Sequence, residues 1–105
     1  MDDRRTKAEN MAEVKVTIIR YIDMAQPIFV EFELEDCNGI KHSFSDKLPV
    51  VSPKYDIELP CDGSLGCSII SETNGTYLID TSKPFDVESY SGKTCFEVFK
   101  EQVVL

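Results

Sequence analysis

The sequence has 105 residues, of which 42% are hydrophobic and 29% are charged, and its formal net charge is −8 at pH 7. This length and composition predict one globular domain with its own hydrophobic core and exclude a disordered chain. The acidity argues against nucleic acid and anionic membrane surfaces as partners, because phosphate groups repel a negatively charged protein.

The N-terminal residues 1–13 are polar and show no hydrophobic periodicity. We expect them to form a disordered or frayed tail that precedes a single β domain over residues 14–105. No apolar segment follows their charges, and no run in the chain approaches the ~20 apolar residues of a membrane span. These features predict a cytoplasmic protein with no membrane partner. Because thiols stay reduced in that compartment, we expect four free cysteines: Cys37, Cys61, Cys67 and Cys95.

The first strand is predicted between Val14 and Asp23, where the residues alternate between two faces. β-Branched residues dominate this segment, as is typical of strands. The inward face is expected to carry Val14, Val16, Ile18 and Ile22, and the outward face Lys15, Thr17, Ile19 and Tyr21.

The clearest pattern in the chain lies between Gln26 and Val51, which we interpret as a β-hairpin with its turn at Asn38-Gly39. The first half of this stretch has the period of a strand with one dry face and one wet face. The dry face carries Ile28, Val30, Phe32 and Leu34, and the wet face carries Phe29, Glu31, Glu33 and Glu35.

The register of this hairpin depends on the length of its loop. A two-residue turn places Glu33 opposite Phe44 and mixes the two faces. A loop of three residues, Cys37-Asn38-Gly39, keeps the faces sorted and lets Gly39 adopt a left-handed conformation without a Cβ clash. We therefore predict the three-residue loop. It pairs Asp36 with Ile40, Leu34 with His42 and Phe32 with Phe44 on the dry face, and Glu35 with Lys41 and Glu33 with Ser43 on the wet face.

A second hairpin is predicted around Asn74-Gly75, between strands at Leu65–Glu72 and Thr76–Thr81. Both loop lengths remain open here. We favour the three-residue loop, again because it sorts the faces. This loop pairs Ile69 with Ile79 and Ser71 with Tyr77.

The remaining segments complete a mainly β protein. Leu48–Val51 is predicted as an edge segment, since Pro49 cannot donate to a ladder, and Ser52–Gly63 as a long loop. The last strand is predicted at Lys93–Phe99. The sequence thus predicts about six antiparallel strands in a small barrel or sandwich. Inward positions are expected for Phe96 and Val98 of the last strand and for Phe85, Val87 and Tyr90 of the turn-rich segment before it.

The chain shows no catalytic or metal-binding motif. His42 is the only histidine, which excludes every two-histidine scheme, and we expect it to be a partly buried structural imidazole. Cys61 and Cys67 have five residues between them, whereas zinc knuckles use closer pairs. We therefore expect a protein that is not an enzyme and that has no catalytic residue, metal or cofactor.

One surface stands out, on the wet face of the central hairpin. Its ordinary interpretation is a solvated outer face. The functional interpretation is a partner-binding surface, in which acids surround an exposed aromatic ring and complement a basic protein. The candidate residues of this surface are Phe29, Glu31, Glu33, Glu35 and Asp36.

Three segments resemble a family of short, uncharacterised bacterial cytoplasmic proteins. They are Tyr21–Pro27 leading into Val30-Glu31, then Phe44–Val51, and lastly Ile79–Pro84 through Gly92 to Phe96–Val98. The similarity spans most of residues 14–99. It implies a bacterial, cytoplasmic origin and no particular activity.

These observations lead to two hypotheses for the function. The first is a small acidic, non-enzymatic protein-interaction module, immunity- or inhibitor-like toward a basic partner. The alternative is a small-molecule-binding β-barrel, which requires an apolar cavity lined from several strands. The oligomeric state cannot be inferred from the sequence.

Overall fold

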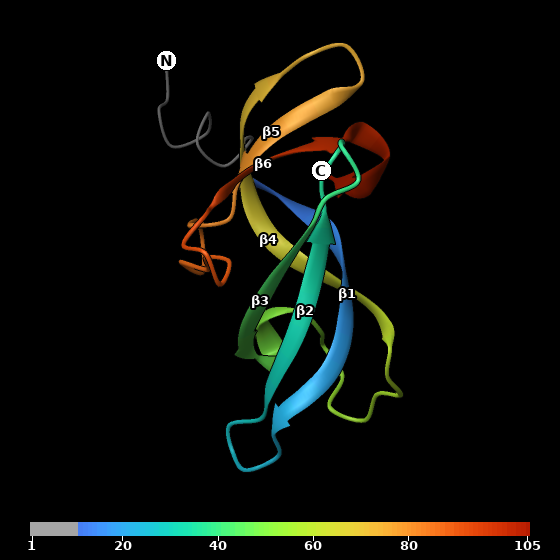
Figure 1. The fold of residues 1–105 in the computed structure, drawn as a ribbon, viewed down its shortest axis with the longest axis vertical. Coiled ribbons are helices and arrows are strands. Elements are labelled where there is room, and N and C mark those ends of the chain that lie inside the picture. The colour runs from blue at the N-terminus through green and yellow to red at the C-terminus, as the bar shows by residue number, and fades with distance from the viewer. Residues whose placement is uncertain (1–10) are drawn as a thin grey trace.

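The computed structural model describes residues 11–105, which fold into one antiparallel sheet that curls into a half-barrel (Figure 1). The strands are β1 (Met11–Asp23), β2 (Phe29–Glu35), β3 (Lys41–Lys47), β4 (Cys61–Glu72), β5 (Thr76–Asp80), β6 (Cys95–Phe99) and β7 (Val103–Val104), and the 3-10 helices are η1 (Leu48–Val50) and η2 (Lys100–Gln102). The strand order is β3-β2-β1-β4-β5-β6, and the short β7 pairs with β1. The predicted mainly β fold with antiparallel strands is confirmed.

The core lies on the concave side of the curled sheet, where aromatic rings from both ends of the sheet meet. Phe32 stacks on Phe44 with ring centroids 5.2 Å apart, and Phe44 meets Phe96 edge-on at 5.6 Å. All three rings are buried. Because Phe44 belongs to β3 and Phe96 to β6, this cluster holds the two terminal strands of the sheet together.

The predicted register of the central hairpin is confirmed. Phe32 lies opposite Phe44, Leu34 opposite His42 and Glu35 opposite Lys41. The three-residue loop is closed by a hydrogen bond from Asp36 N to Ile40 O at 2.9 Å. Gly39 has a φ of +80°, a conformation that a residue with a Cβ adopts only with strain.

Strand β1 ends at Asp23 as predicted but differs from the prediction in its first residue and in the facing of its last residues. It begins at Met11 rather than Val14, so residues 11–13 belong to the sheet, and the remainder of the predicted tail lies outside the described residues. The register with β2 shifts at Ile19 and again at Ile22. Each such bulge reverses the facing of the residues that follow it. The inward position predicted for Ile22 is therefore wrong: its side chain is exposed, and Tyr21 packs against the core instead.

The second hairpin also contains a bulge. Thr73 N donates to Thr76 O at 3.0 Å, which closes a two-residue turn at Asn74-Gly75 instead of the favoured three-residue loop. Ile69 lies opposite Ile79 as predicted, but the register shifts between Ile69 and Ser71. Ser71 therefore faces Leu78 rather than Tyr77. The extra residue of this bulge, Ile70, compensates for the shorter turn, so the apolar residues on the far side of the bulge still face the same side of the sheet.

Other segments also depart from the prediction, and β4 begins at Cys61, inside the stretch predicted as a long loop. Leu48–Val50 forms the 3-10 helix η1 rather than an edge segment of the sheet, with Pro49 in its first turn. In the segment before β6 only Val87 is buried as expected, whereas Phe85 and Tyr90 are 52% and 60% exposed. The ring of Phe85 instead lies over the backbone of β4 at Gly66, where a Cβ would come within 3.0 Å of Phe85 Cε2.

Candidate functional site

The negative charge on the outer face of β2 is partly neutralised by neighbouring strands. Glu31 forms an ion pair with Arg20 of β1, with Glu31 Oε1 2.7 Å from Arg20 Nη2. The bulge at Ile19 is what places Arg20 opposite Glu31. Lys47 Nζ lies 5.7 Å from the centre of the Phe29 ring, a cation–π distance. Phe29 and Glu31 thus already have cationic partners within the chain.

Asp36 lies apart from the other candidate residues because its carboxylate turns inward. Its exposed fraction is 8%. Oδ1 accepts hydrogen bonds from the amides of Asn38 and Ile40, and Oδ2 lies 2.8 Å from His42 Nε2. Burial raises the pKa of Asp36, but these hydrogen bonds outweigh it and hold the pKa below its usual value. Asp36 therefore organises the loop of the hairpin.

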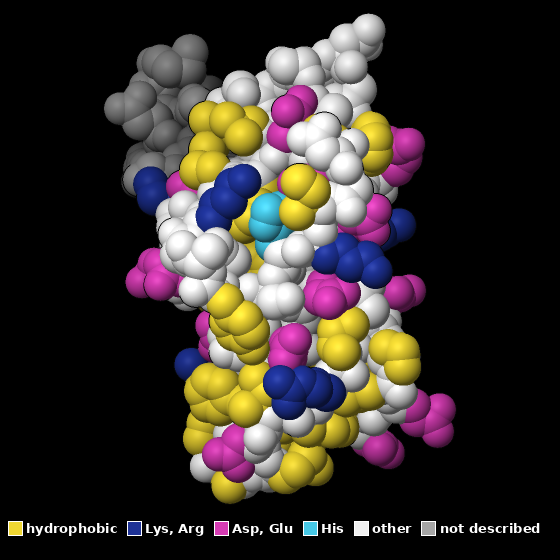
Figure 2. Space-filling view, in the orientation of Figure 1, with side chains coloured by type: hydrophobic (Ala, Val, Ile, Leu, Met, Phe, Trp, Pro, Cys, Tyr) yellow, Lys and Arg dark blue, Asp and Glu magenta, His cyan; other side chains and the backbone are white. Residues whose placement is uncertain are grey.

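His42 is the partly buried imidazole expected from the register. Its ring centre lies 4.8 Å from that of Phe96, and its side chain is 13% exposed. Figure 2 shows this single histidine at the surface, with hydrophobic and basic side chains beside it. With one nitrogen held by Asp36 and the ring packed on Phe96, His42 has the surroundings of a structural residue.

Among the described residues, two wet-face acids form no ion pair within 4 Å: Glu33, which is half-buried, and Glu35, which is exposed at the end of β2, opposite Lys41. Glu35 forms one wall of a hollow of about 310 Å³. The opposite wall comes from the end of β6 and from η2, which lie beside the β2–β3 loop (Figure 1). The hollow is lined by Glu35, Asp36, Phe99, Glu101 and Gln102.

The amide of Gln102 joins the two walls of this hollow, which we call the Phe99 hollow. Gln102 Nε2 donates to Glu35 O at 2.9 Å, and Gln102 Oε1 accepts from Phe99 N at 2.9 Å. A main-chain bond from Cys37 N to Glu97 O at 2.8 Å adds a further link. The shape of the hollow is therefore fixed by hydrogen bonds between segments far apart in the sequence.

The Phe99 hollow combines an aromatic surface with negative charge. Phe99 is 47% exposed, and the described residues that line the hollow with it include Glu35 and Glu101 but no lysine or arginine. Sequence reasoning missed Phe99 and Glu101. The alternation of β6 could have identified them. Phe96 and Val98 face inward, so Phe99 must face outward, and Glu101 follows it closely in the sequence.

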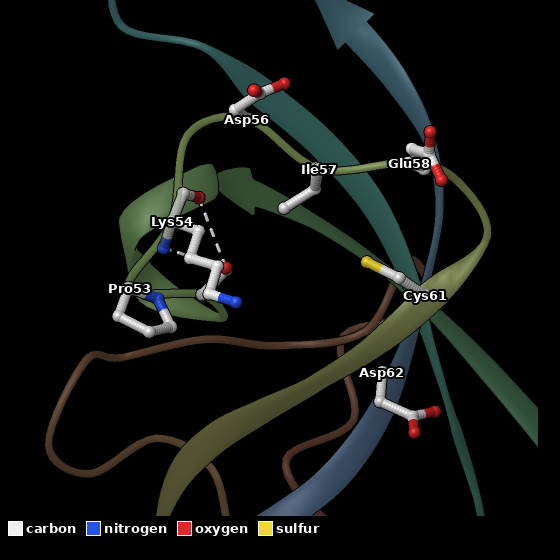
Figure 3. Close-up of a pocket in the computed structure, with 8 residues that line it drawn as sticks. Pro53, Lys54, Asp56, Ile57, Glu58, Cys61 and Asp62 are labelled. Carbon is white, nitrogen blue, oxygen red and sulfur yellow. Dashed lines mark hydrogen bonds between the residues drawn. The ribbon is translucent and has the colours of Figure 1, made fainter.

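A larger hollow, of about 550 Å³, lies under the loop before β4 (Figure 3). The thiol of Cys61 points toward Ile57, whereas the carboxylates of Asp56, Glu58 and Asp62 point in different directions. Within residues 11–105, no three His, Cys, Asp or Glu side chains are grouped as metal ligands would be. Ile57 O accepts a hydrogen bond from Tyr21 Oη at 3.2 Å, which ties the loop to β1.

Comparison with known proteins adds no identification. No family model matches the chain, and the searches of curated proteins and of solved structures found no match either. In the described part of the chain, neither helical turn has the length and apolarity needed to cross a membrane.

Proposed function

We propose that this protein is a small, non-enzymatic interaction module that binds a basic protein partner, in the manner of an immunity protein or inhibitor, in the cytoplasm of a bacterium. The observation that carries this proposal is the Phe99 hollow, which is lined by the half-exposed Phe99 and by Glu35 and Glu101, with no lysine or arginine among the described residues of the lining. Aromatic anchors contribute much of the binding energy at protein interfaces, and complementary charge accelerates encounter and sets specificity.

The overall charge supports the same partner chemistry. The chain has 19 acidic and 11 basic residues, so its long-range field attracts a cationic protein and accelerates encounter. On the outer face of β2 that charge is partly cancelled by Arg20 and Lys47. The Phe99 hollow is therefore a better contact point than the surface around Phe29.

The alternative function, a small-molecule-binding barrel, is less well supported. Its ligand would occupy the concave side of the sheet, where Phe32, Phe44 and Phe96 pack against one another. The larger hollow lies under a loop and is not lined from several strands.

The test is calorimetric titration with a synthetic peptide rich in lysine and arginine, at low and at physiological salt. The double variant E35Q/E101Q removes two charges from the hollow, and the control E58Q/D62N removes two charges elsewhere. We expect the first variant to lose affinity by about tenfold and the control by less than about twofold. Equal losses in both variants, or no binding by the unmodified protein at low salt, would contradict the proposal.

A further inference from the structure

Lysine side chains cover three aromatic rings within the chain. Lys47 Nζ lies 5.7 Å from the Phe29 ring centre, Lys93 Nζ 5.4 Å from that of Phe96 and Lys100 Nζ 5.3 Å from that of Tyr77. These distances are in the range where a cation is attracted to the face of an aromatic ring. The fold thus repeatedly pairs a basic side chain with an aromatic ring.

Phe99 differs from these three rings, because the described residues that line its hollow include no lysine or arginine. The next residue, Lys100, is committed elsewhere, because its ammonium group pairs with Glu72 and lies over Tyr77. The lining around Phe99 instead contributes the carboxylates of Glu35 and Glu101. A half-exposed ring and two carboxylates form a complementary environment for a cation from another molecule.

We propose that the Phe99 hollow binds one arginine side chain of the partner, with its guanidinium stacked on the Phe99 ring and hydrogen-bonded to Glu35 and Glu101. This inference rests on the proposed function and specifies the partner's chemistry. A guanidinium is planar and weakly hydrated, so it can stack on a ring while its edge donates to carboxylates. A lysine ammonium is a compact, strongly hydrated charge. It cannot stack on the ring and bind both carboxylates at the same time as well as a guanidinium can.

Gln102 is the positioning residue of this arrangement. Its amide holds the Glu35 wall and the Phe99 wall together through two hydrogen bonds of 2.9 Å. If the spacing of the walls changed, the Phe99 ring and the Glu35 carboxylate could no longer bind the same cation. We therefore expect Q102A to weaken arginine binding although Gln102 carries no charge.

The experiment compares three short Gly/Ser peptides that differ at one central residue, which is arginine, lysine or uncharged citrulline. Their affinities are measured by NMR titration of the unmodified protein, of F99L and of the control F85L, which replaces another half-exposed phenylalanine. We expect arginine to bind about fivefold more tightly than lysine and citrulline to bind least. F99L should abolish the preference for arginine, and F85L should retain it.

The outcomes separate the two proposals. Equal binding of the arginine and lysine peptides, or an unchanged preference in F99L, would refute the arginine stacking and leave the proposed basic partner in place. Failure of both cationic peptides to bind more tightly than citrulline would contradict the proposed function as well. The spectrum of each variant reports separately whether it is folded.

Discussion

Asp36 and His42 face each other beside the loop of the β2–β3 hairpin, with Asp36 Oδ2 2.8 Å from His42 Nε2. The other carboxylate oxygen accepts from the amides of Asn38 and Ile40. The side chain of Asp36 therefore holds both the turn of the hairpin and His42, the second residue of β3. Since Asp36 also lines the Phe99 hollow, the same contacts support the candidate binding site.

Replacement of Asp36 by Asn should destabilise the protein in a pH-dependent way. Its hydrogen bonds hold the pKa of Asp36 in the folded protein below the usual value of an aspartate, so the unfolded chain takes up this proton first as the pH falls. The stabilisation is therefore complete above about pH 5 and is lost progressively as the pH falls through the lower, folded pKa. We expect D36N to lower the free energy of unfolding by about 1–3 kcal/mol at pH 7.

Urea unfolding of D36N and of the unmodified protein at pH 7, 4 and 2.5 checks this prediction. The control is D56N, at an exposed aspartate, which should change stability by less than about 0.5 kcal/mol. The difference between D36N and the unmodified protein should narrow toward pH 2.5. A difference that stays constant over this range would show that the charge of Asp36 contributes nothing.

Loss of the Phe44 ring should cause much greater destabilisation. Phe44 is buried and contacts both Phe32 and Phe96, so F44A leaves a cavity where β3 meets β6. We expect a cost of about 3–5 kcal/mol in urea unfolding, against less than about 1 kcal/mol for F85A at a half-exposed ring. Similar costs for the two variants would contradict the assignment of the core.

The register of the central hairpin could be predicted from the sequence because two local signals agree there. A glycine suited to a left-handed turn and a strict alternation of apolar residues select the same pairing. The bulges at Ile19 and Ile70 could not be predicted, because no glycine or proline marks them. Their positions depend on packing against neighbouring strands, and the first of them exchanged the roles of Tyr21 and Ile22.

The candidate site was predictable only in part, for a related reason. Alternation identified the acids on the outer face of β2, but it gave no information about Arg20 and Lys47 from the adjoining strands. The Phe99 hollow is formed by the end of β2 and by the C-terminal residues, including Gln102. Contacts over such a separation arise from the curl of the whole sheet, which local patterns do not encode.

The four thiols should differ in reactivity. All four cysteines are free, but Cys67 is fully buried, whereas Cys95 is exposed. Burial, followed by the charges of Glu13 and Asp80, raises the pKa of Cys67 to about 11, so its reactive thiolate is scarce at pH 8. Iodoacetamide labelling followed by mass spectrometry should modify Cys95 first and Cys67 only after unfolding. Equal labelling of both in the folded protein would contradict this account.

The position at which a cationic peptide binds can be located by NMR. Backbone amide shifts of the ¹⁵N-labelled protein are followed during titration with the single-arginine peptide. We expect one saturable set of shifts with its largest changes at Glu35, Phe99 and Gln102. Largest changes in residues 52–62, around the other hollow, or shifts that never saturate would contradict it.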